Sequence, residues 1–185
     1  MKTAIKSFSP AVLAMLMIIP VCQTSAADAT AGSGLLASSG LRVKTSMAEV
    51  IGVREIESGK LEQGIRKSQA ALSKASIASL RKPLLDNLCV AHLAINNLQQ
   101  AGQYCQAAVT TGKASAISYN NRAVMYYVLG NLEASLEDLD AATHLGKFQK
   151  MVAGNLKIVN QQNIFSKNAG LMIETDLSLV SKTIR

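Results

Sequence analysis

The chain has 185 residues, a formal net charge of +7, no tryptophan, and aromatic side chains at only 4% of its positions. A moderate positive charge with so few rings for base stacking argues against a nucleic-acid-binding protein. The length suits one domain rather than several.

The first 26 residues have the pattern of a secretion signal. Lys2 and Lys6 precede nine apolar residues at 11–19, too few to span a bilayer, and small residues lead to Ala26. We expect cleavage after Ala26 or one residue later, and a periplasmic protein. Losing the two lysines lowers the charge from +7 to +5. The alternative is a lipoprotein with its lipid on Cys22.

The rest of the chain divides by composition and apolar spacing. Residues 27–44 are rich in Gly, Ser and Ala and predict a flexible leader. From Thr45 the apolar residues recur at helical spacing, which predicts a helical domain over 45–162. Its expected helices are 47–56, 61–72, 84–94, 98–110, 118–129, 132–145 and 148–160. The weakly patterned tail, 163–185, is expected to be poorly structured or docked on the helices.

Two asparagines mark predicted helix starts. Asn97 and Asn131 each stand just before the second helix of a pair, where a side-chain oxygen can accept from a free backbone N–H. Short helix pairs with capped turns are therefore expected.

Several residues recur at an interval of 34 positions. Asn87, Asn121 and Asn155 keep this spacing, and so do the pairs Asn97 with Asn131, Leu98 with Leu132, and Ala108 with Ala142. This period is typical of helix-turn-helix units that stack because none buries its apolar face alone. The function should therefore lie on a surface rather than in an enclosed pocket.

The third unit resembles the tetratricopeptide repeat family. Its matching residues are Tyr119, Ala123, Tyr126, Gly130, Ser135 and Ala142, with Ala123 facing Ser135 at a close helix contact. The second unit matches through Leu85, Leu88, Cys89, His92, Asn96, Ala101, Cys105 and Ala108, and the first more loosely through Gly52, Gly59, Gly64 and Ala71. The resemblance implies an all-α, right-handed α-solenoid of about three helix pairs plus a C-terminal capping helix. The chain departs from the family in lacking a proline at the end of each unit.

In this family the first helices of successive units line a concave groove, which would place Asn87, Asn121 and Asn155 inside it. A side-chain amide both donates and accepts, so an asparagine ladder suits the main chain of an extended peptide. The expected apolar stripe beside the amides consists of Val90, Val124, Leu93 and Tyr127. Two alternatives stay open: the asparagines hold neighbouring helices or loops, or the protein's own leader or tail occupies the groove.

Cys89 and Cys105 remain after signal removal, an even number in an oxidising compartment. Each lies eight residues from Asn97, so antiparallel helices would bring them face to face. We expect a disulfide; the alternative is two small buried side chains.

The sequence contains no pattern typical of an enzyme. Residues 57–60 read ESGK but lack the rest of a phosphate-binding loop, and His92 and His144 are isolated from each other and from other metal ligands. We expect no catalytic residue, cofactor, metal or small-molecule substrate.

The prediction is a non-enzymatic scaffold that binds a protein or extended peptide in its groove. The alternative is a structural envelope component that binds anionic surface, or weakly binds itself, through a basic first unit. The basic residues are Lys60, Arg66, Lys67, Lys74, Arg81 and Lys82, and the third unit carries Glu133, Glu137, Asp138 and Asp140.

Overall fold

The computed structural model describes residues 38–47 and 49–183, with side chains through residue 169. Within these residues all regular structure is helical, as expected for an all-α protein. The helices are α2 (Val53–Glu57), α3 (Leu61–Leu72), α4 (Ala78–Ala94), α5 (Leu98–Thr110), α6 (Ala116–Val128), α7 (Leu132–His144) and α8 (Gln149–Thr183). The predicted signal peptide, 1–26, and most of the leader lie outside the described residues.

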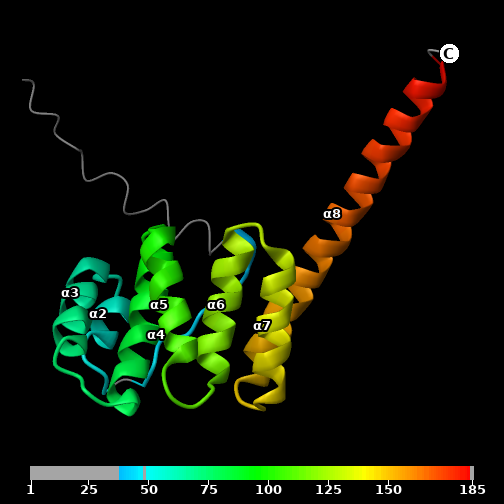
Figure 1. Ribbon diagram of the computed structural model, residues 1–185. Coiled ribbons are helices and arrows are strands. Elements are labelled where there is room, and N and C mark those ends of the chain that lie inside the picture. The colour runs from blue at the N-terminus through cyan, green and yellow to red at the C-terminus, as the bar shows by residue number, and fades with distance from the viewer. Residues whose placement is uncertain (1–37, 48, 184–185) are drawn as a thin grey trace, which may run out of the picture.

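The helices form a row in chain order, each packed on the next (Figure 1). The odd-numbered and even-numbered helices differ in whether they contact the next helix of the same kind. In the described part of the chain α2, α4, α6 and α8 also contact one another in sequence, whereas α3, α5 and α7 make no such contacts. The even-numbered helices therefore lie on the inner side of a bend, and the odd-numbered helices on its outer side.

The turns follow the predicted chemistry. Asn97 Oδ1 accepts from the backbone N–H of Gln100 at 3.2 Å, and Asn131 Oδ1 accepts from that of Ala134 at 3.1 Å. Both predicted helix caps are confirmed. The preceding residues, Asn96 and Gly130, have φ angles of 56° and 78°. Glycine and asparagine tolerate this left-handed conformation better than other residues.

Small residues allow close contact within a pair. Ser135 Oγ donates to the carbonyl oxygen of Ala123 at 2.8 Å, and both residues are fully buried, which confirms the predicted contact between α6 and α7. The first pair is closer still: a Cβ at Gly64 would lie 2.5 Å from a side-chain carbon of Ile56. Larger residues at these positions would force the helices apart.

The first predicted helix is wrong in its extent. Only α2, Val53–Glu57, is helical, and residues 41–47 are extended. The chain turns between them, with the N–H of Val50 donating to the carbonyl of Met47 and Gly52 at a φ of 91°. Apolar spacing over 47–56 reflected this turn followed by one helical turn and a half, not a continuous helix.

The last helix is longer than predicted. The predicted end at residue 160 is wrong, because α8 continues to Thr183 and projects beyond the row (Figure 1). After Asn160 the sequence contains no proline, and its first glycine is Gly170. A single internal glycine costs a helix only about 1 kcal/mol, so nothing local ends α8 earlier. No helix in the described part of the chain is both long and apolar enough to cross a membrane.

Cys89 of α4 and Cys105 of α5 form a disulfide in the structure, and both are fully buried. The bond joins the two helices of the second unit at their midpoints. Its sequence separation is 16 residues, the loop expected from the equal distances to the turn.

Replacing both Cys89 and Cys105 by alanine should lower the free energy of unfolding by about 3 kcal/mol, because the closed loop no longer restricts the unfolded chain. Urea unfolding under oxidising conditions measures this. A reducing agent should bring the parent protein near the variant and leave the variant unchanged. Equal midpoints for both proteins without reductant would contradict a stabilising disulfide.

Candidate binding groove

The repeated asparagines occupy equivalent places on the inner helices. Asn87 lies on α4, Asn121 on α6 and Asn155 on α8, and their exposed fractions are 0%, 0% and 1%. Buried amides need hydrogen-bond partners. Their partners therefore show what the groove holds.

Residues 41–46, here called the strap, provide those partners. Asn155 Oδ1 accepts from the N–H of Arg42 at 2.9 Å, and Asn155 Nδ2 donates to the carbonyl of Arg42 at 2.7 Å. Asn121 makes the same two contacts with Lys44, at 2.9 and 2.8 Å. Each amide thus pairs with both main-chain groups of one strap residue.

At the third position the pairing is incomplete. Asn87 Oδ1 accepts from both the N–H and the hydroxyl of Ser46, each at 2.8 Å. Its Nδ2 has no hydrogen-bond partner among the described residues. The asparagine ladder (Asn87, Asn121 and Asn155, each one rung) therefore pairs fully with the strap at Asn121 and Asn155 and only partly at Asn87.

Asn120 is a further member of the ladder that the 34-residue period does not reveal. Its Nδ2 donates to the carbonyl of Arg42 at 2.9 Å, and its Oδ1 accepts from Asn155 Nδ2 at 2.8 Å. It is fully buried between α6 and α8. Its only sequence signal is the Asn-Asn pair, because the second unit has Asp86 at the equivalent position.

The strap runs antiparallel to the order of the repeats. The sequence separations of its three asparagine pairs are 113, 77 and 41 residues. They decrease by a constant 36, which is one repeat of 34 plus one dipeptide of the strap. Each repeat therefore matches two residues of extended chain, an advance of about 6.6 to 6.8 Å.

Alternation along the strap separates its two faces. Leu41 and Thr45 are each 7% exposed, whereas Arg42 and Lys44 point their side chains to solvent. Val43 packs against all three clusters of the hydrophobic core. The strap consequently ties the core of the first, second and third units together.

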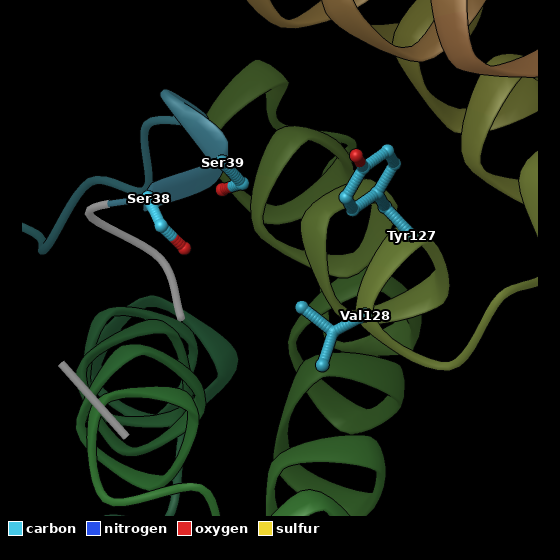
Figure 2. A pocket seen from close by; sticks show the side chains of 4 residues that line it. All are labelled: Ser38, Ser39, Tyr127 and Val128. Carbon is cyan, nitrogen blue, oxygen red and sulfur yellow. The ribbon is translucent and has the colours of Figure 1, made fainter. Parts of the chain in front are cut away.

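The predicted apolar stripe lies along this strap. Val124 and Tyr127 belong to the cluster that contains Leu41, and Leu93 to another against which Val43 packs. Val90 and Val43 line the same pocket, of about 290 Å³. Tyr127 and Val128 also face Ser38 and Ser39 across a second pocket of about 290 Å³ (Figure 2). The residues are placed together as expected, but the protein's own chain covers them.

The leader prediction is thus corrected for its last residues, since 41–44 are bound in the groove rather than flexible. The structure agrees with the alternative in which part of the leader occupies the groove. Residues 34–36, the apolar part of the leader, lie outside the described residues, and α8 carries the tail away from the groove (Figure 1). The missed signal was the alternation of Leu41, Val43 and Thr45 with polar residues, a strand pattern.

Arg81 and Lys82, two of the basic residues predicted for the first unit, lie on α4 and have structural partners. Arg81 donates to the carbonyls of Leu72 and Ala75, at 3.4 and 3.0 Å, and Lys82 to those of Ala108 and Thr111, at 2.6 and 3.1 Å. They satisfy free carbonyls at the ends of α3 and α5. Neutralising them would therefore damage the fold as well as any surface they form.

Asp86 is a buried acid between α4 and α6. Ser118 Oγ donates to its Oδ2 at 3.2 Å, and the other oxygen has no partner among the described residues. Burial raises the pKa of Asp86 from 3.8 to about 6, although the Ser118 hydrogen bond and the charge of Lys82 both act to lower it. The ionised carboxylate therefore destabilises the folded state.

The two histidines lie in different surroundings. His92 is buried and stacked on Tyr104 with ring centroids 5.2 Å apart, and burial lowers its pKa. His144 is exposed, and its Nδ1 lies 2.8 Å from the carbonyl of Asp140. Among the described side chains, no three His, Cys, Asp or Glu residues lie together in a way that could hold a metal ion.

No family model, curated protein or solved structure matches the chain. Membership of the tetratricopeptide repeat family consequently remains a proposal.

Asn121→Ala should release the middle of the strap, because it removes both contacts with Lys44. Hydrogen exchange followed by NMR should show a selective increase at the Lys44 amide. Asn131→Ala is the matched control: it removes a helix cap in the same unit, at about 1 kcal/mol, without touching the strap. Equal exchange of the Lys44 amide in both variants would contradict the conclusion that Asn121 holds the strap.

Asp86 should make stability depend on pH. Its folded pKa of about 6 lies above the ordinary 3.8, so its contribution is complete below about pH 4 and is lost as pH rises through 6. At about 1.4 kcal/mol per pKa unit, the loss is up to about 3 kcal/mol. Asp86→Asn should stabilise the protein at pH 7.5 and flatten this slope in urea titrations from pH 4 to 7.5. The control is Glu137→Gln on the exposed face of α7, which should keep the parent's slope.

Proposed function

We propose that this chain is an exported, non-enzymatic interaction protein, a tetratricopeptide-like right-handed α-solenoid that binds an extended protein segment in its concave groove. The observation that carries the proposal is the pairing of Asn121 and Asn155 with both main-chain groups of alternate strap residues. The ligand is another protein or peptide, and no cofactor takes part.

The contacts explain why such a groove would accept more than one sequence. Every polypeptide carries the N–H and C=O groups that the asparagines bind, proline's missing N–H excepted. Selectivity would come from the inward positions, where the strap places Leu41 and Val43 against the apolar stripe and the Thr45 hydroxyl donates to Glu57 Oε1. A segment with apolar or β-branched residues at alternate positions therefore fits.

The strap is then the occupant in cis, and a partner must take its place. An unoccupied groove would leave the ladder amides and the stripe of Val90, Val124, Leu93 and Tyr127 open to water. Self-occupancy keeps the protein soluble until a ligand binds. Location in the periplasm, which the signal pattern suggests, is part of the same proposal.

Opening the groove tests the proposal. Val43→Asp puts a carboxylate among three apolar clusters, so the strap should leave while the ladder stays intact. A fluorescent peptide with the sequence of residues 38–47 should then bind in trans, measured by anisotropy. Lys44→Asp introduces the same residue one position along, on the exposed face, and should bind the peptide no better than the parent protein.

A second opening variant guards against a local effect of the aspartate. Lys44→Pro removes the N–H that Asn121 accepts, and should also expose the groove. Circular dichroism should report unchanged helix content in all three variants. Failure of both opened, folded proteins to bind the peptide at millimolar concentration would reject the groove as a binding site.

A further inference from the structure

The strap fits the groove imperfectly at Asn87, the last rung of the ladder. At Asn121 and Asn155 the amide Nδ2 donates to a strap carbonyl, whereas Asn87 Nδ2 has no hydrogen-bond partner in the described part of the chain and is fully buried. A buried donor without a partner is unfavourable by the free energy of a lost hydrogen bond. This defect is specific to the present occupant, since the other rungs show what a full pairing requires.

The covalent connection to α2 causes the defect. After Ser46 the chain turns, with the N–H of Val50 donating to Met47 and the carbonyl of Ile51 accepting from Ser68 Oγ at 3.1 Å. Asn87 Nδ2 receives no strap carbonyl, whereas the carbonyls of Lys44 and Arg42 accept from Asn121 and Asn155. Strap residues cannot continue past Asn87 in extended conformation while they remain attached to this turn.

We propose that the groove's ligand in trans is an extended segment of another polypeptide that runs straight past Asn87, and that it displaces the strap. This inference rests on the proposed function of the groove. The segment carries apolar or β-branched residues at the positions of Leu41, Val43 and Thr45, and it stays extended through the position of Ser46. It gains the hydrogen bond to Asn87 Nδ2 that the strap does not make.

The C-terminal end of the strap can be displaced by such a segment at little cost in buried surface. Met47 is 75% exposed and Ile51 is 59% exposed, so moving this turn gives up little buried apolar surface. Arg42 and Lys44 likewise have exposed side chains, with Lys44 Nζ 5.5 Å from the centroid of the Phe148 ring. The strap is held mainly by its main chain and by the side chains of Leu41, Val43, Thr45 and Ser46, and a competing strand can reproduce such contacts.

The test uses Asn87→Asp, which keeps an acceptor for Ser46 and replaces the unpaired donor with a second oxygen; the buried carboxylate that it adds is matched in the control. In the otherwise native chain, Asn87→Asp should raise strap exchange less than the control does, because the strap makes no bond to Nδ2. Asn121→Asp is the matched control, with the same chemical change at a rung whose donor is paired. It should raise strap exchange at least about ten-fold.

The second measurement is peptide affinity in the Val43→Asp protein. The probe peptide carries the sequence of residues 41–46 followed by Val-Thr, which continues the alternation past the last rung. Adding Asn87→Asp should weaken its binding about ten-fold, the equivalent of one hydrogen bond. Saturating peptide should also raise the exchange of the strap amides in the native protein.

The outcomes separate this inference from the function beneath it. If the opened protein binds the peptide but Asn87→Asp leaves its affinity unchanged, the inference is wrong and the groove stands. Strap exchange that stays constant at saturating peptide likewise overturns displacement. A strap-exchanged dimer in gel filtration would make a second copy the occupant and also overturn it. If the opened protein does not bind the peptide, both the proposed function and this inference are wrong.

Discussion

The structure depends on pairing an extended segment of period two with helical repeats of period 34. A strand exposes both main-chain groups of alternate residues on one edge, and the ladder supplies one amide per repeat to meet them. The match works because the strap runs antiparallel to the order of the repeats and advances by one dipeptide for each repeat. Asn155, Asn121 and Asn87 consequently fix the register of the strap along its whole length.

That pairing also determines how the separate units become one body. The outer helices α3, α5 and α7 do not contact one another in the described chain, so each unit packs on the next chiefly through its outer helix against the next inner helix. The strap crosses that inner side and places Val43 against all three core clusters. It thereby supplies long-range contacts to a row of helices whose other contacts are between neighbours.

Under the proposed function, the same features make the groove a binding site that the strap closes in the free protein. Main-chain recognition has little sequence preference, so a segment of the chain itself is an adequate occupant and holds the site by proximity. The unpaired Asn87 donor, next to buried Asp86, shows where this occupant is weakest. In this proposal the strap, which stabilises the fold, and the ligand compete for the groove most closely at Asn87 on α4.

The 34-residue interval, the capping asparagines and the facing small residues determined the helix pairs, because each follows from local chemistry and repeats in register. They also identified Asn87, Asn121 and Asn155, the stripe beside them and the pairing of Cys89 with Cys105. Only the tertiary structure decided that the strap fills the groove, that Asn120 joins the ladder and that Asn87 is left short. Those contacts join residues up to 113 positions apart, so no local pattern in the sequence determines them.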